Sequence, residues 1–254
     1  MSIFRGIIAA FSIYSVIPMP HINWKAKGTG YAISFFPIVG IFLGTLLYGW
    51  FCVCDCLEIS KNIFAAIAVA IPVLVTGGIH LDGYMDTVDA IASHSDKQRR
   101  LEIMKDSHPG AFACIYISLY FLIQFAFFQN INENNIIWFI GIFAISRSLS
   151  GIVATLMPGA RNNGMLSDML KTADSDNNKK NIGLIIFPFM VMAMIIILYM
   201  SLDISLTMII IAAEIMWVLI YCIYMKTTIG GVTGDTSGFF LQISELIGQM
   251  LILL

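Results

Sequence analysis

Long runs of apolar residues divide this chain and limit the folds that it can adopt. A helix needs about 20 predominantly apolar residues to cross the hydrocarbon core of a bilayer. The runs cover residues 31–51, 63–76, 111–128, 136–157, 182–200, 205–224 and 239–254, and the second and the last are short for a full crossing. The pattern predicts an all-α, polytopic integral membrane bundle of about six to seven transmembrane helices.

The composition supports a membrane protein. Hydrophobic residues make up 58% of the chain and charged residues 12%, whereas soluble domains carry about 25% charged residues. This number of charged residues is too small to cover the surface of a globular protein. We therefore expect the lipid bilayer to contact much of the surface of this protein. The net charge of −2 is too small to indicate nucleic acid as a partner. No soluble stretch separates the runs, so residues 1–254 are predicted to form a single membrane-embedded domain.

The segment before the first run is predicted to be a short interfacial or re-entrant piece. Residues 4–17 are mostly apolar, but they are too few to span a bilayer comfortably. They end at Pro18-Met-Pro20, which closes the segment before the first full run.

The connecting segments predict the orientation of the bundle. Segments 1–30, 77–110, 158–181 and 226–238 are long and polar, and they alternate with the short segments 55–62, 129–135 and 201–204. Among all these segments, the short ones contain only one basic residue, Lys61. Because basic residues accumulate on the cytoplasmic side, the long segments are predicted to face the cytoplasm.

The central motif is His80-Leu-Asp82-Gly-Tyr-Met-Asp86-Thr-Val-Asp89, which follows the second run. The three aspartates are spaced i, i+4, i+7 and share one face of a helix. Their mutual repulsion would be relieved by a divalent cation, and carboxylate oxygens suit Mg²⁺, Mn²⁺ or Ca²⁺. The alternative is a solvated acidic face that Arg99, Arg100 and Lys105 neutralise. His80 is a weaker candidate, either as a substrate contact or as a helix-end residue.

Two further polar features accompany this motif. Asp106 precedes the third run, where it or Ser107 could cap the helix, and it could also act as a fourth carboxylate. Arg147 lies inside the run 136–157, and an intramembrane charge usually faces a cavity or a partner. It could pair with Glu214, or it could bind a substrate phosphate, and we favour the phosphate.

Two glycine-containing segments are candidate anion-binding loops. Arg161, followed by Asn163 and Gly164, can reach an anion at the predicted cytoplasmic boundary. The second segment opens the last run, and its small residues would let the backbone approach a phosphate closely. Its candidate ligand-binding and catalytic residues are Gly230, Gly231, Thr233, Gly234 and Asp235.

Together these residues resemble the cobalamin synthases, the adenosylcobinamide-GDP ribazoletransferases. The resemblance rests on the stretch from Thr76 to Asp89, on Met104-Lys-Asp106-Ser, on Ala160-Arg161 with Gly164, and on Gly230-Gly-Val-Thr-Gly-Asp235, and it covers nearly the whole chain. His108-Pro109 departs from the family pattern. The resemblance implies that adenosylcobinamide-GDP reacts with α-ribazole or its 5′-phosphate, releasing GMP and forming adenosylcobalamin or its phosphate, with Mg²⁺ as the cofactor.

These implications give each candidate residue a hypothetical role. Asp82, Asp86 and Asp89 would hold Mg²⁺ against the diphosphate. Asp106 or Asp235 would complete the metal shell or accept the proton of the attacking ribose hydroxyl. Arg147 or Arg161 would stabilise the phosphates. The sequence allows an oligomer as well as a monomer.

Two alternative functions remain open from the sequence. A CDP-alcohol phosphotransferase also uses Asp-Gly motifs at a membrane face, but it requires Ala-Arg where this chain has Asp86-Thr87, and a second aspartate motif that this chain lacks. A cation-binding transporter would use its acids near the middle of the membrane. Here the acids flank an interfacial loop, which favours a catalytic site on the cytoplasmic face of the cytoplasmic membrane.

Overall fold

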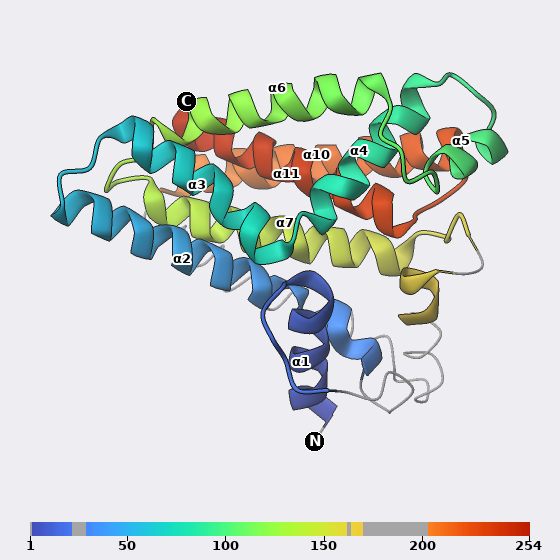
Figure 1. Ribbon diagram of the computed structural model, residues 1–254, viewed down its shortest axis with the longest axis horizontal. Helices are drawn as coiled ribbons and strands as arrows, with labels where there is room; N and C mark the ends of the chain where they lie inside the picture. The colour runs from blue at the N-terminus through green and yellow to red at the C-terminus, as the bar shows by residue number, and fades with distance from the viewer. Residues whose placement is uncertain (1, 22–28, 162–163, 170–202) are drawn as a thin grey trace.

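The computed structural model describes residues 2–21, 29–161, 164–169 and 203–254 (Figure 1). The described part of the chain consists of helices joined by turns and loops, with one isolated β-bridge between Gly159 and Val232. Its helices are α1 (Ser2–Tyr14), the 3₁₀ helix η1 (Thr29–Phe35), α2 (Phe36–Cys56), α3 (Lys61–Thr76), α4 (Ile79–Ala92), α5 (Lys97–Ile103), α6 (Ala111–Phe128), α7 (Ile136–Leu156), α10 (Ile204–Thr228) and α11 (Gly234–Leu253).

The predicted all-helical membrane bundle is confirmed. Among the described residues, five helices are long and apolar enough to cross a bilayer, and α3 with α4 makes up to six if this bent pair is one span. The spans predicted at 31–51, 111–128, 136–157 and 205–224 correspond to the segment Tyr31–Cys56 and to α6, α7 and α10. The span predicted at 182–200 lies outside the described residues.

The second predicted run, 63–76, corresponds to α3, and the chain turns sharply after it. The chain bends by 93° between α3 and α4. Gly77 and Gly78 make this bend with φ angles of 65° and 77°, in the left-handed region that glycine adopts without a steric penalty. After the bend, α4 runs obliquely across the bundle (Figure 1). The aspartate motif begins at the start of this helix.

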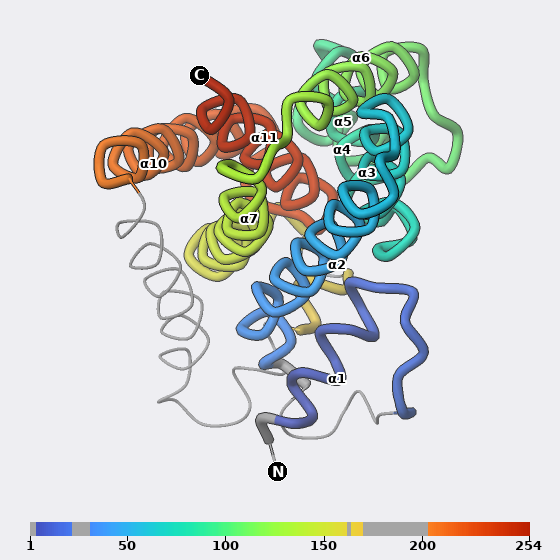
Figure 2. The backbone as a smooth tube through the Cα atoms, turned by 90° about the vertical axis from the view of Figure 1, so that its left-hand side faces the viewer, coloured from blue at the N-terminus to red at the C-terminus, as the bar shows by residue number. Residues whose placement is uncertain are grey.

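The long helices run side by side along the long axis of the molecule, and Figure 2 views many of them nearly end-on. The connections from α2 to α3 and from α6 to α7 lie at one end, whereas α5 and the connection from α10 to α11 lie at the other (Figure 1). Helix α1 crosses the long helices near the start of α2 instead of running with them (Figure 1). The connections from α2 to α3 and from α6 to α7 are short, as predicted, and the one from α4 to α6 is long. The connection from α10 to α11, which was predicted to be long, covers only residues 229–233.

Helix α7 forms the centre of the bundle. In an apolar stretch of 18 residues of α7, 89% of the residues are buried, whereas the share is 22% in the corresponding stretches of α6 and α10. Side chains of α2, α7 and α11 meet in one apolar cluster that contains Leu43, Phe139 and Phe240. Helices that face lipid on one side can expose large apolar residues there, as α6 and α10 do with Leu122 and Ile223. The buried core thus holds α7 and α11 in fixed positions beside the polar end of the molecule.

Candidate active site

The aspartate motif lies on α4, and this helix packs closely against α11. A Cβ atom at Gly83 would lie 2.8 Å from the Cα and the carbonyl oxygen of Asp235, and one at Gly238 would lie 2.8 Å from the carbonyl oxygen of His80. These obstacles are backbone atoms, so both positions require glycine for the two helices to approach this far. The crossing brings Asp235, from the far end of the chain, next to the acids of α4.

Asp86 and three other carboxylates lie close enough for their charges to interact. The charges of Asp82, Asp235 and Asp89 repel a charge on Asp86, while Arg161 attracts it. Asp82 is exposed, and Asp86 and Asp89 are half-buried. This group of charges is strongly negative, because one arginine faces several acids.

Arg161 is held between α5 and α11. Its Nη1 donates to Asp235 Oδ2 at 3.3 Å, and its Nη2 donates to the carbonyl oxygen of Leu101 at 2.9 Å. The hydroxyl of Thr233 also donates to Asp235 Oδ2, at 3.4 Å. The predicted anion-binding arginine therefore lies at the acidic group, with its guanidinium oriented by two partners.

A short backbone pairing joins the two predicted loops. The amide of Ala160 donates to Val232 O, and the amide of Val232 donates to Pro158 O, both at 2.9 Å. A Cβ atom at Gly231 would lie 2.2 Å from Pro158 O, so this pairing requires glycine there. Gly230 has a φ of 99°, which also favours glycine. The loop residues predicted as a ligand cradle thus have a structural function that brings Arg161 towards Asp235.

The same loop leads into the N-terminus of α11. Thr233 and Thr236 cap this end reciprocally, with the Thr233 side chain accepting from the Thr236 amide at 3.1 Å. Open space surrounds the position where Gly234 would carry a Cβ atom. A helix N-terminus with free amide groups favours an anion, so this end of α11 suits a phosphate group.

Asp89 has a role that the sequence did not predict. Its two carboxylate oxygens accept hydrogen bonds from the amides of Gly110 and Ala113, at 2.6 and 2.9 Å. Asp89 therefore caps α6 from a neighbouring helix, and the prediction that Asp106 or Ser107 caps this helix is wrong.

Asp106 lies apart from this group. It accepts hydrogen bonds from the amide and the ring Nδ1 of His108, at 3.0 and 2.9 Å, and 61% of its side chain is exposed. The hydrogen bond from the His108 side chain lowers the pKa of Asp106. The charges that act on Asp106 are those of His108 and Arg99, so its predicted place as a fourth carboxylate of the cluster is not supported by its position.

Arg99 and Arg100, two of the three basic residues in the solvated-face alternative, engage other partners. Arg99 pairs with Glu102 at 3.0 Å. Arg100 donates to Thr228 O at 2.9 Å, and Lys97 donates to Lys226 O at 3.2 Å. These two side chains satisfy carbonyl groups at the end of α10, which is a common use of basic residues at a helix C-terminus.

A cavity of about 600 Å³ opens beside the acids. Its polar lining comes from α4, from the segment after α7, from the loop before α11 and from the start of α11, and includes His80, Asp82, Arg161, Thr233, Gly234 and Asp235. Its apolar lining comes from α1, η1, α2 and α7 and from residues 165–169. Gly164 also lines it, whereas Asn163 lies outside the described residues. The volume is within the range of small-molecule binding sites, about 300–1,000 Å³.

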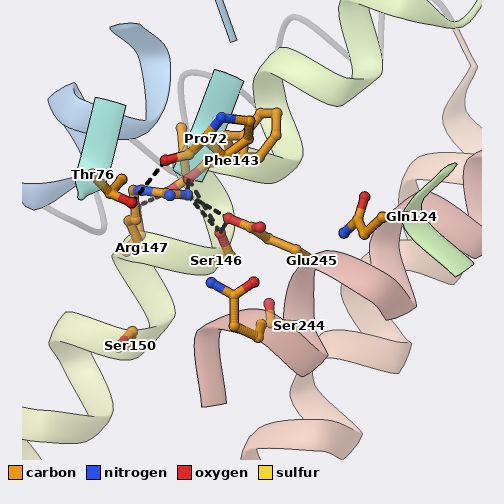
Figure 3. A network of polar contacts seen from close by, with 12 residues as sticks. Pro72, Thr76, Gln124, Phe143, Ser146, Arg147, Ser150, Ser244 and Glu245 are labelled. Carbon is orange, nitrogen blue, oxygen red and sulfur yellow. Dashed lines mark hydrogen bonds and ion pairs between the residues drawn. The ribbon is translucent and has the colours of Figure 1, made fainter. Parts of the chain in front are cut away.

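Arg147 lies deeper, in a buried polar network between α7 and α11 (Figure 3). Its Nη1 forms an ion pair with Glu245 at 2.6 Å and donates to Phe143 O at 2.8 Å, and both charged side chains are at most 2% exposed. Glu214 instead accepts a hydrogen bond from Ser244 at 2.7 Å. The predicted pairing with Glu214 is wrong, and the engagement with Glu245 gives no support to Arg147 as a phosphate ligand.

The residues near Asp86 fit one mode of magnesium binding. Within the described ranges, no group of three His, Cys, Asp or Glu side chains is placed to hold a metal ion by itself. Mg²⁺ is, however, usually bound through one or two carboxylates, with waters and substrate phosphates completing its shell. Asp82 and Asp86 could supply such carboxylates beside the cavity. The three-aspartate set with Asp89 stays a prediction.

Comparison with known proteins identifies the family. The family model described as cobalamin-5-phosphate synthase matches residues 6–253. An adenosylcobinamide-GDP ribazoletransferase of Lachnoclostridium phytofermentans is 34% identical, over 96% of this chain and 92% of its own. Proteins of the same name from Clostridium botulinum and Fusobacterium nucleatum are each 30% identical, over 97% and 96% of this chain and 96% and 95% of their own. No solved structure matches the chain significantly. The chain therefore belongs to the cobalamin-5-phosphate synthase family.

Proposed function

We propose that the chain joins adenosylcobinamide-GDP to α-ribazole or α-ribazole 5′-phosphate, giving adenosylcobalamin or its 5′-phosphate and GMP. The observation that carries this proposal is the surplus of carboxylates around Asp86, next to a helix N-terminus and to a cavity that Asp82, Arg161 and Asp235 line. Such a site suits a diphosphate bound with a cation. The full-length relatives share the transferase name, which supports this function over a CDP-alcohol phosphotransferase or a transporter.

Asp82 and Asp86 would hold Mg²⁺ together with the diphosphate, and the ion would neutralise the charge of the phosphates. Arg161 and the first amides of α11 would bind phosphate oxygens that the ion leaves free. Phosphoryl transfer depends mainly on such positioning and charge neutralisation.

Asp235 is the best-placed acid to accept the proton of the attacking ribose hydroxyl. Arg161 and Thr233 both contact its Oδ2 atom, and these contacts fix the carboxylate in one orientation. Its Oδ1 atom is the proposed proton acceptor. The hydroxyl oxygen then forms the new bond to the phosphorus, the bond to the GMP oxygen breaks, and GMP leaves.

We further propose that this site faces the cytoplasm. The basic residues of the long connections support that orientation. Lys97, Arg99 and Arg100 lie on α5, at the same end of the bundle as the connection from α10 to α11 (Figure 1).

The test is GMP release by the purified protein with adenosylcobinamide-GDP, α-ribazole 5′-phosphate and Mg²⁺. We expect turnover that stops when a chelator removes Mg²⁺ and returns when Mg²⁺ is restored. Asp86→Asn should lower kcat/KM at least about 100-fold, since it weakens charge stabilisation of the phosphates. Asp55→Asn is the matched control, because Asp55 is exposed at the opposite end of the bundle. Folded wild-type protein that releases no GMP would contradict the proposed function.

A further inference from the structure

The cavity beside the acids has two chemically different parts. Its polar lining, with Asp82, Arg161 and Asp235, suits the diphosphate. Its apolar lining includes Tyr14 of α1 and Phe36 of α2. A phosphate gains nothing from apolar walls, so this second part must accommodate an uncharged portion of a substrate.

Aromatic rings form the wall of the apolar part. Tyr14 and Phe36 stack with their centroids 4.0 Å apart and their planes at 29°. The imidazole of His80 continues this group, at 5.9 Å from the Tyr14 ring and 5.2 Å from the Phe36 ring. Phe36 and His80 are 4% and 7% exposed, whereas Tyr14 is only partly buried, so Tyr14 is the ring of this group that can offer a surface to a planar aromatic ligand.

His80, which lines this cavity and also a smaller one beside Arg147, has an unsatisfied polar atom. His80 is 7% exposed, and among the described residues its Nε2 atom has no hydrogen-bond partner. Leaving a buried polar group unpaired costs about 1–3 kcal/mol, so an unpaired atom beside a cavity indicates a ligand partner. His80 is also joined through α4 to Asp82, two residues further along the chain.

From these observations we propose that Tyr14, Phe36 and His80 form the binding site for the aromatic base of the attacking nucleoside, and that His80 Nε2 hydrogen-bonds to the free ring nitrogen of that base. This inference rests on the proposed function. The base of α-ribazole is a flat, largely apolar bicycle with one free ring nitrogen, which matches one unpaired atom in an apolar wall. Guanine carries several donors and acceptors, which would be left unpaired against the same wall.

The site also explains how the nucleophile is positioned. The base would lie against rings from α1, α2 and α4, and the ribose would extend towards Asp82 and Asp235. The attacking hydroxyl would then reach the proposed proton acceptor, Asp235 Oδ1. Tyr14, Phe36 and His80 are therefore positioning and specificity residues, and they do not touch the reacting phosphorus.

The test compares two nucleotides in the GMP-release assay: α-ribazole 5′-phosphate and its indole counterpart, in which a C–H group replaces the free ring nitrogen. Wild-type protein should prefer α-ribazole 5′-phosphate by about tenfold in kcat/KM, the size expected for one buried hydrogen bond. In His80→Leu the ratio of the two kcat/KM values should fall towards one. α-Ribazole 5′-phosphate loses the hydrogen bond to Nε2, whereas the indole nucleotide has no such bond to lose. His80→Gln keeps an N–H donor and should retain part of the preference.

The aromatic wall has a separate readout. Tyr14→Leu should raise KM for both nucleotides alike, while the preference between them and KM for adenosylcobinamide-GDP stay unchanged. His21→Leu is the matched control, since His21 is exposed and distant in sequence from the motif.

Several outcomes would overturn the inference. An unchanged preference in His80→Leu would show that Nε2 does not contact the ring nitrogen. A rise in KM for adenosylcobinamide-GDP alone in Tyr14→Leu would assign the wall to guanine. If His80→Leu does not fold, the absence of a preference in wild-type protein still contradicts the hydrogen bond. Failure of the proposed function is distinct, because wild-type protein would then release no GMP with either nucleotide.

Discussion

At the scale of single residues, the acids of the motif divide into two kinds. Asp82 and Asp86 share the acidic group with Asp235 and Arg161 and have the charges that a cation would balance. Asp89 contributes charge too, but both of its oxygens hold the first amides of α6. Residues with the same spacing on one helix face therefore differ in what they do.

We expect Asp89→Ala to destabilise the protein by about 1–2 kcal/mol, the cost of losing a helix cap. The amides of Gly110 and Ala113 would lose their acceptor. The measurement is the thermal unfolding midpoint in detergent, together with the Mg²⁺ concentration that gives half-maximal GMP release. A lower midpoint with an unchanged Mg²⁺ requirement is the expected result. A large increase in the Mg²⁺ requirement would instead identify Asp89 as a metal ligand.

Single residues also show why part of the site escaped prediction from the sequence. The aspartate motif and Arg161 could be found because their residue types and spacing carry the chemistry. Glu245 could not be assigned to Arg147, because the two lie 98 residues apart and their pairing depends on how α7 and α11 are rotated about their axes. The sequence did show that Glu245 is an acid inside an apolar run, which indicates a residue with a buried partner or function.

At the scale of helices, the contact between α4 and α11 determines whether the acids come together. Gly83 faces the backbone of Asp235 directly. The apolar runs predicted the helices themselves, since length and hydropathy are local properties. They could not predict this crossing, which depends on a 93° bend and on two glycines in separate helices.

Gly83→Ala should separate α4 from α11. The added methyl group would lie 2.8 Å from backbone atoms that cannot rotate away, at a cost of about 1–3 kcal/mol. We expect kcat/KM to fall about 100-fold, since a displacement of about 1 Å at reacting groups has that effect. Gly49→Ala is the control, because nothing lies within 4 Å of its added Cβ atom. Equal activity in the two variants would show that the close crossing is not required.

The ion pair of Arg147 and Glu245 joins α7 to α11 inside the bundle (Figure 3). Glu245→Gln should destabilise the fold by about 3–5 kcal/mol, because it leaves a buried guanidinium without its counter-ion. Arg147→Met combined with Glu245→Leu removes both charges and should recover most of that stability. Thermal unfolding of the single and the double variants measures this. A double variant that is as unstable as Glu245→Gln would rule out the unpaired charge as the cause.

At the scale of the whole molecule, the connections at the two ends of the bundle define a polar end with the acids and an opposite end with short turns (Figure 1). Cys56 is exposed at the opposite end, and Gln98 is exposed on α5 at the polar end. These two positions can therefore report the orientation of the protein in a membrane.

A membrane-impermeant thiol reagent should label Cys56 in intact cells when it is the only cysteine kept. In a cysteine-free background, Gln98→Cys should be labelled only after the membrane is permeabilised. This difference follows from the excess of basic residues in the long connections. The reverse labelling pattern would place the acids outside the cell and remove the proposed cytoplasmic site.

The ion pair inside the bundle also has a consequence for biosynthesis. The ribosome makes α7 before α11, so Arg147 is synthesised 98 residues ahead of the glutamate that neutralises it. A lone charge is costly in the hydrocarbon region, so α7 is a poor candidate for early release from the insertion machinery. Its stable insertion and the arrival of Asp235 beside Asp86 depend on the same later helix. Membrane integration and catalytic competence would therefore be completed in one step of synthesis.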